Sequence, residues 1–250
     1  MAGPLALVGS GEYTDAMLDV DRDLLDGRPP RYVQIPTAAA PEGPARLGYW
    51  VELGRRHAER LGVAAVPLVV RDRGEADDPA VADQIAGAGL IYLSGGRPTF
   101  LADTLRDTAL WRAIVEAWRA GAALAGCSAG AMAFGDWVPE VRRRSRPPQS
   151  GRPGRGGPGL GLLPHLRVLP HFDAFMGRMP DLMLRPLTRA PEGVTVVGID
   201  EDTALMGGPE TWTVRGRRSA WLLGAGRRRE FPTGSTITIA SPAATGSAGD

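Results

Sequence analysis

Short apolar runs alternate with amphipathic segments throughout the first half of this sequence. The runs are bounded by glycine or proline and are rich in branched side chains, which is typical of strands buried on both faces. The predicted strands cover residues 5–8, 32–35, 64–70, 90–93 and 122–125. The predicted helices between them cover residues 14–25, 44–61, 79–88 and 108–120. This alternation predicts an α/β fold with a doubly wound, mostly parallel sheet flanked by helices.

The second half of the sequence is less regular. Residues 137–158 are rich in Arg, Pro and Gly and carry almost no apolar side chain, so we expect a mobile surface loop there. The patterns that follow predict strands at 166–169 and 194–199, a helix at 174–188, and short strands at 203–206, 211–214 and 220–223. The short strands predict an antiparallel C-terminal extension. We expect one domain over residues 1–240 and a disordered tail over 241–250.

Composition excludes several classes of site. Of the 250 residues, 29 are Lys or Arg and 28 are Asp or Glu. All 29 are arginine, because the sequence contains no lysine, and it contains no asparagine either. The absence of lysine rules out a P-loop, a Schiff-base site and a Ser–Lys pair, and the absence of asparagine rules out a Cys–His–Asn arrangement. Three histidines and one cysteine are too few for a Cys/His zinc cluster, so we expect neither a metal nor a cofactor.

Charge and cysteine content indicate partners and compartment. A formal net charge of +1 gives no reason to expect nucleic acid or a membrane surface as a partner. No apolar stretch approaches the roughly 18 residues of a membrane span, and no signal peptide is apparent. A lone cysteine argues against an oxidising compartment. We therefore expect a cytoplasmic protein.

The most specific motif is Gly126-Cys127-Ser128-Ala129-Gly130, directly after the fifth predicted strand. G-x-S-x-G at a strand-to-helix turn is the nucleophile elbow, whose glycines permit a strained turn that lifts the serine hydroxyl above the sheet edge. We therefore predict Ser128 as a nucleophile and the backbone N–H of Ala129 as one oxyanion donor. Cys127 is expected to be a small buried side chain that faces the sheet.

A serine nucleophile needs a general base, and the sequence offers three histidines. His171 follows the predicted strand at 166–169, at the kind of position where sites of this architecture lie, so it is the preferred base. His165 lies in the turn before that strand. His57 lies among charged residues on a predicted helix, and we expect it to be solvated.

Several acids are candidates for orienting the base. Glu201 and Asp200 follow the predicted strand at 194–199, Asp173 lies two residues after the preferred histidine, and Asp136 follows the elbow. With Glu201 the chain order is Ser, His, acid. That order differs from the Ser, acid, His order of α/β-hydrolases and disfavours their fold.

A second glycine cluster, Ser94-Gly95-Gly96-Arg97, follows the predicted strand at 90–93. A Gly-Gly turn at a strand end beside the elbow can offer a backbone N–H to an oxyanion, so Gly95 and Gly96 are candidate donors. Arg97 is a candidate substrate-binding residue, because a guanidinium there would favour a carboxylate on the substrate.

Several blocks of sequence together resemble the peptidase S51 family, which includes cyanophycinase and dipeptidase E. They cover residues 93–96, 126–131, 159–163, 171–172 and 198–204 and occur in the family's order, within a resemblance that extends from residue 5 to about residue 223. The most specific parts are S-A-G-A in the elbow and I-D-E-D-T-A at 199–204.

The resemblance implies roles for individual residues. The family's nucleophile falls on Ser128, its base on His171 and, in the cyanophycinase branch, its acid on Glu201. It further implies a flavodoxin-like fold related to class I glutamine amidotransferases, no metal, often a homodimer, and hydrolysis of small aspartyl peptides. Where family members usually carry Asp or Asn after the paired glycines this chain has Arg97, which argues against arginine-bearing cyanophycin as the substrate.

Two other functions fit the same residues. One is a catalytically idle ligand-binding or regulatory protein on an amidotransferase-like fold, in which His171 would be unable to approach Ser128. The other is an esterase or amidase that uses the same elbow.

Overall fold

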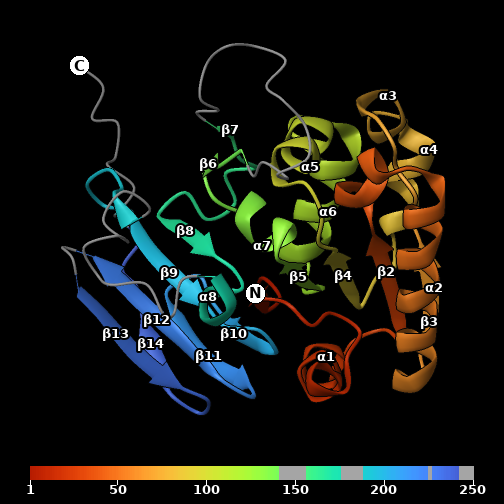
Figure 1. Cartoon of the computed structure of the whole chain (residues 1–250). Coiled ribbons are helices and arrows are strands. Elements are labelled where there is room, and N and C mark those ends of the chain that lie inside the picture. The colour runs from red at the N-terminus through yellow and green to blue at the C-terminus, as the bar shows by residue number, and fades with distance from the viewer. Residues whose placement is uncertain (141–155, 176–187, 225–226, 242–250) are drawn as a thin grey trace.

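The computed structural model describes residues 1–140, 156–175, 188–224 and 227–241. Its centre is an eight-stranded sheet with the order β14-β11-β10-β1-β5-β4-β2-β3 (Figure 1). The strands of this sheet are β1 (Leu5–Val8), β2 (Arg31–Ile35), β3 (Ala64–Pro67), β4 (Leu90–Leu93), β5 (Ala123–Cys127), β10 (Thr203–Gly207), β11 (Thr211–Gly216) and β14 (Thr236–Thr238).

Five neighbouring strands of this sheet, β1, β5, β4, β2 and β3, are parallel. The helices that connect them are α1 (Leu18–Leu25), α2 (Pro44–Leu61), α3 (Arg73–Ala76), α4 (Pro79–Ala82), α5 (Pro98–Leu105) and α6 (Ala109–Arg119). Val8 pairs with Cys127 and Leu93 pairs with Gly126, so the carboxyl ends of β1, β4 and β5 lie at one edge of the sheet. The predicted α/β fold with a mostly parallel sheet is confirmed.

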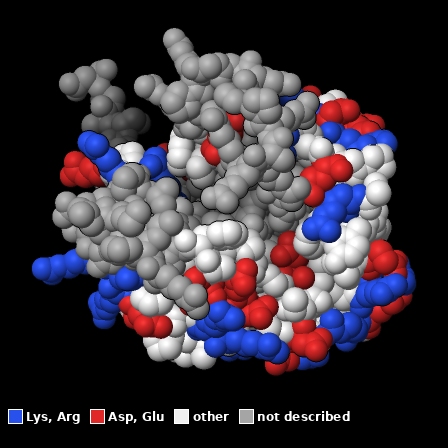
Figure 2. Space-filling model, viewed as in Figure 1, with Lys and Arg blue, Asp and Glu red and all other residues white. Residues whose placement is uncertain are grey.

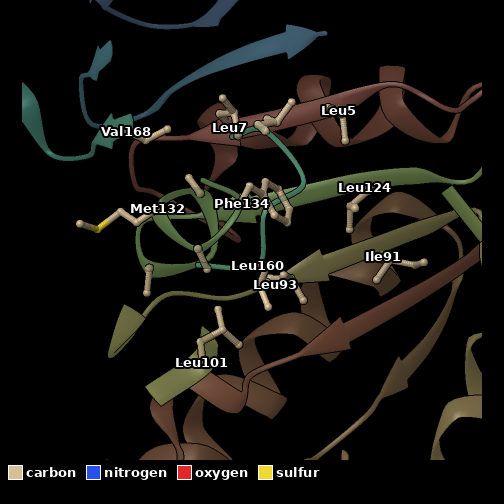
Figure 3. Close-up of a cluster of buried hydrophobic side chains, with 14 of the residues drawn as sticks. Leu5, Leu7, Ile91, Leu93, Leu101, Leu124, Met132, Phe134, Leu160 and Val168 are labelled. Carbon is tan, nitrogen blue, oxygen red and sulfur yellow. The ribbon is translucent and has the colours of Figure 1, made fainter. Parts of the chain in front are cut away.

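Alternate side chains of the parallel strands enter two separate cores, because successive residues of a strand point to opposite faces. On one face Leu5 and Leu7 of β1 pack in a cluster with side chains of α5 and α6 and with Phe134 (Figure 3). On the other face Ala6 and Val8 pack with side chains of α1 and α2. Burial on both faces explains the continuous apolar runs in the sequence.

The C-terminal strands form an antiparallel extension of the central sheet and a second, mixed sheet. β10 pairs with β1 in the antiparallel sense and carries β11 and β14 at the edge of the central sheet. A second sheet has the order β13-β12-β9-β8 and comprises β8 (Leu166–Leu169), β9 (Thr195–Ile199), β12 (Ser219–Gly224) and β13 (Arg227–Pro232). Within it β8 and β9 are parallel, so their carboxyl ends also meet, with Leu169 opposite Gly198.

Some elements differ from the sequence-based expectation. The sequence patterns missed α3, α5, β13 and β14. β3 is an edge strand with two exposed and two half-buried residues, not a strand buried on both faces, because β2 is the only strand among the described residues that pairs with it. The helix α8 spans Phe172–Phe175, so it begins before the expected helix at 174–188, most of which lies outside the described residues.

The expected loop at 137–158 and the expected tail fall largely outside the described residues. Two short strands, β6 (Trp137–Val138) and β7 (Gly157–Pro158), pair at the two ends of the 137–158 stretch. In the part of the chain that the structure describes, none of the helices is long and apolar enough to cross a membrane. Arginine and acidic side chains are interspersed on the face drawn in Figure 2, in keeping with the nearly balanced charge.

Candidate active site

The nucleophile elbow has the geometry that the motif predicts. Ser128 stands between β5 and the helix α7 (Ala129–Ala133) with φ 49° and ψ −105°, a conformation that costs energy for any residue with a side chain. A Cβ at Gly126 would lie 2.6 Å from the carbonyl carbon of Gly130, and a Cβ at Gly130 would lie 2.3 Å from the carbonyl oxygen of Leu93. Both glycines are therefore required by close backbone contact.

Ser128, His171 and Glu201 come together at the carboxyl ends of three different strands. His171 follows β8 and Glu201 follows β9. The His171 Nε2 lies 3.2 Å from Ser128 Oγ, and its Nδ1 lies 2.9 Å from Glu201 Oε1. The imidazole thus bridges the hydroxyl and the carboxylate, although 43 and 30 residues of sequence separate it from them.

This geometry fixes which imidazole nitrogen can act as a base. A carboxylate accepts hydrogen bonds only, so His171 donates its Nδ1–H to Glu201 and leaves Nε2 as an acceptor for the Ser128 hydroxyl proton. The His171 side chain is 28% exposed and that of Glu201 is 40% exposed, so solvent and a substrate can reach the pair.

The other candidate acids have different partners. Asp173 accepts a hydrogen bond from the backbone N–H of Glu201 at 2.9 Å and forms an ion pair with Arg218. Asp200 accepts from Trp221 Nε1 at 2.9 Å and from a backbone N–H at 3.2 Å, and burial raises its pKa. Asp136 is exposed. Of the four acids considered, the structure brings only Glu201 to the imidazole of the preferred histidine.

The expectation that His57 is solvated is wrong. Its side chain is buried between α2 and α1, and its Nε2 lies 2.8 Å from the Oδ2 of Asp21. The neighbouring Arg55 and Arg56 instead pair with Glu52 on the exposed face of α2. The charged neighbours in the sequence therefore say nothing about the face of the helix on which this histidine lies.

His165 is also buried and is separate from the proposed base. Its Nε2 lies 3.3 Å from the backbone carbonyl oxygen of Pro209, in the loop before β11. This carbonyl oxygen is the only hydrogen-bond partner of the ring among the described residues. Of the three histidines, the structure therefore leaves His171 as the one that lies beside Ser128.

The turn after β4 approaches the elbow through Gly95. A Cβ on Gly95 would lie 3.4 Å from the Cβ of Ser128. Gly96 has φ +146°, and a Cβ there would lie 2.3 Å from the carbonyl oxygen of Ala38, so no other residue fits this position without strain. The Gly95 N–H already donates to the Glu12 carboxylate at 3.0 Å. Among the described residues the N–H of Gly96 has no acceptor, which makes it the free donor of this turn.

Glu12 is a site residue that the sequence reasoning missed. It follows β1 and is half-buried, with Oε1 on the Gly95 N–H and Oε2 2.7 Å from the Sγ of Cys127. Cys127 is fully buried as expected, and burial together with the Glu12 charge raises the pKa of its thiol. The place of Glu12 in the sequence could have pointed to the site, because Glu12, like Ser128, follows the carboxyl end of a parallel strand.

The model of peptidase family S51 matches residues 5–213. The chain belongs to peptidase family S51. A peptidase from an acI-B1 actinobacterium is 38% identical to this S51 chain, with a TM-score of 0.82 over 95% of this chain and 97% of that chain. A putative peptidase E protein from Listeria monocytogenes EGD-e is 18% identical, with a TM-score of 0.55 over 93% of this chain and 99% of that chain, and supports the fold alone.

A search of curated proteins found no match. The family match, together with the 38% identical peptidase, identifies this S51 member as a serine-type peptidase. Among the described residues no group of three or more His, Cys, Asp or Glu side chains is placed to hold a metal ion.

Proposed function

We propose that this S51 peptidase hydrolyses small acidic peptides beside aspartyl residues through a Ser128–His171–Glu201 triad. The observation that carries the proposal is the unbroken pair of hydrogen bonds from hydroxyl to imidazole to carboxylate, at 3.2 and 2.9 Å. Both distances are within the reach required of a nucleophile, its base and the group that orients the base.

The geometry supports a two-step acyl transfer. Ser128 Oγ attacks the peptide carbonyl carbon while His171 Nε2 takes the hydroxyl proton, and Glu201 stabilises the resulting imidazolium. We assign the oxyanion to two backbone N–H groups, that of Ala129, which follows Ser128, and that of Gly96, which has no acceptor among the described residues. His171 then returns the proton to the leaving amine. A water molecule next attacks the acyl carbon while His171 Nε2 takes its proton, and this proton passes to Ser128 Oγ as the acid product leaves.

Arg97 supports an acidic substrate. Arg97 follows Gly96 directly, and its backbone is held by a hydrogen bond from its N–H to the Ala38 carbonyl at 2.8 Å. Its side chain is exposed. A guanidinium there can pair with the free carboxylate of an aspartyl substrate, which is the side-chain carboxylate of an α-linked peptide and the α-carboxylate of a β-linked one. Because this ion pair would bind the ground state and the transition state alike, its loss should act mainly on KM.

The test is a comparison of substrates and variants. We expect the wild type to cleave α- or β-linked aspartyl dipeptides faster than a neutral dipeptide or a simple ester. Ser128→Ala should lower kcat by about 10⁴-fold or more. Arg97→Ala should raise KM for the aspartyl peptide several-fold and leave hydrolysis of the neutral substrate unchanged, with the exposed Arg112→Ala as a matched control. Full activity in Ser128→Ala would refute the mechanism.

The same panel distinguishes the alternatives. A preference for simple esters over every peptide would favour the esterase or amidase. The absence of any hydrolysis would favour a ligand-binding protein, although the short distance between Ser128 and His171 removes the separation that this alternative requires.

We further propose a homodimer that works in the cytoplasm. The family resemblance supports the dimer, and the lone, buried cysteine supports a reducing compartment. Light scattering during size-exclusion chromatography should give twice the chain mass of 26.4 kDa, and a mass equal to that of one chain would refute the dimer.

A further inference from the structure

Two consecutive side chains of the loop after β1 bond to the turn that carries the free Gly96 N–H. Glu12 accepts the Gly95 N–H at 3.0 Å, and the hydroxyl of Tyr13 lies 2.6 Å from Ser94 Oγ. Neighbouring residues of one loop thus bond to neighbouring residues of another. We call this pair of contacts the Glu12–Tyr13 clamp.

The clamp is anchored in the protein interior. Tyr13 and Ser94 are buried, and Gln34 Nε2 donates both to the Tyr13 hydroxyl at 2.9 Å and to the carbonyl oxygen of Trp50 at 2.7 Å. Because Gln34 donates to the phenol oxygen, the Tyr13 hydroxyl proton is free to go to Ser94. The turn is therefore tied through Tyr13 to β2 and α2.

The loop accepts backbone strain to make both contacts. Tyr13 has φ 70°, in the left-handed region that residues with a side chain rarely adopt. A strained, non-glycine residue persists only where the surrounding structure holds it. Here the strain lets the side chains of Glu12 and Tyr13 reach the same turn.

Glu12 also touches the elbow itself. Its second oxygen accepts the thiol proton of Cys127, the residue before the nucleophile. A Cβ on Gly95 would lie 2.8 Å from Glu12 Oε1 and 3.4 Å from the Cβ of Ser128, so Gly95 lies between the carboxylate and the nucleophile. One carboxylate therefore joins β1, the turn after β4 and the elbow after β5.

We propose that Glu12 and Tyr13 are positioning residues that hold the Ser94–Gly96 turn, and with it the proposed oxyanion donor Gly96 N–H, in place beside Ser128. This inference rests on the proposed serine mechanism and adds the element that pre-organises one of its donors. Glu12 holds the turn through its hydrogen bonds, because its two oxygens accept the Gly95 N–H and the Cys127 S–H. A donor whose position varies stabilises the oxyanion of the transition state less, because that stabilisation depends on a fixed distance and direction of the hydrogen bond.

The experiment measures kcat and KM on an aspartyl p-nitroanilide for wild type and four variants. Removing one oxyanion donor costs about 10²–10³-fold in kcat, so loosening its support in Glu12→Ala should cost about 10–100-fold, with KM within threefold of wild type. Glu12→Gln keeps an acceptor for the Gly95 N–H and should stay within threefold of wild type. Tyr13→Phe should lower kcat by about 3–10-fold.

Asp77→Ala is the matched control, because Asp77 also accepts a long-range backbone N–H, that of Ala109 at 2.9 Å, but does so at the start of α6. It should leave kcat unchanged. Circular dichroism and the thermal midpoint check that each variant is folded. If Glu12→Ala does not fold, the comparison of Glu12→Gln and Tyr13→Phe with wild type still decides the matter.

Three results would overturn the inference: unchanged kcat in both Glu12→Ala and Tyr13→Phe, a rise in KM alone, or a Glu12→Gln variant as slow as Glu12→Ala. A rise in KM alone would mean that the carboxylate binds substrate. Ser128→Ala is assayed in parallel. If Ser128→Ala is inactive while Glu12→Ala has full activity, only the clamp is refuted. If Ser128→Ala is active, the proposed function itself fails.

Discussion

Replacing Glu201 by glutamine is the sharpest test of the acid in the proposed triad. The change keeps the size of the side chain and removes its charge. Glu201 lies 2.9 Å from His171 Nδ1 and is 40% exposed. An amide that turns its NH₂ toward Nδ1 forces the proton onto Nε2, where it blocks proton transfer from Ser128. An amide that turns its oxygen inward keeps the tautomer but no longer stabilises the imidazolium.

The exposure sets the expected magnitude. Exchanging the fully buried acid of a serine protease for its amide lowers kcat by about 10⁴-fold. Water reaches Glu201 and can partly solvate the imidazolium of His171, so the Coulomb interaction is weaker than in a buried pair. We therefore expect Glu201→Gln to lower kcat by about 10²–10³-fold, or about 3–4 kcal/mol in the barrier.

The assay is the kcat of aspartyl peptide hydrolysis, with Asp200→Asn and Asp173→Asn as controls. Asp200→Asn should change the thermal midpoint more than kcat, because this side chain bonds to Trp221. Asp173→Asn should have an intermediate effect, since it holds the backbone N–H of Glu201. If either control lowers kcat more than Glu201→Gln does, the assignment of the acid is refuted.

Two further predictions concern the elbow. Because burial and the Glu12 carboxylate raise the pKa of Cys127, its thiolate is scarce at pH 8, and Ellman's reagent should label it only after denaturation; fast labelling of the folded protein would contradict this. Gly130→Ala should lower the free energy of unfolding by about 1–3 kcal/mol or more, because the new methyl group meets the Leu93 carbonyl. The control is Gly48→Ala, on the exposed face of α2 with no atom near its Cβ position. It should instead raise the free energy of unfolding by about 0.5–1 kcal/mol in the same urea titrations, and equal effects of the two substitutions would contradict the argument.

The parallel core and the elbow were predictable because their signals are local. Strands buried on both faces appear as continuous apolar runs, and β1, β4 and β8 match the predicted strands at 5–8, 90–93 and 166–169. The strained Ser128 conformation follows from two glycines that lie within two residues of it. The position of His171 followed from one rule, that sites gather beyond the carboxyl ends of strands.

Features that depend on long-range packing could not be predicted in the same way. β13 consists mostly of exposed arginine-rich sequence, and its strand conformation comes from backbone pairing with β12. His57 is buried because α1 places Asp21 against it, a contact across 36 residues. Glu12 lies in a loop without a recognisable motif, and its role becomes visible only when Gly95 and Cys127 are brought beside it.

The most direct test of the central claim is reaction with a fluorophosphonate, followed by peptide mass spectrometry. The account predicts one covalent adduct per chain, on Ser128, formed by wild type and absent in Ser128→Ala. It predicts a much slower reaction in His171→Ala, because Nε2 no longer takes the hydroxyl proton. An adduct on another residue, or none on a wild-type protein that hydrolyses aspartyl peptides, would contradict the serine mechanism.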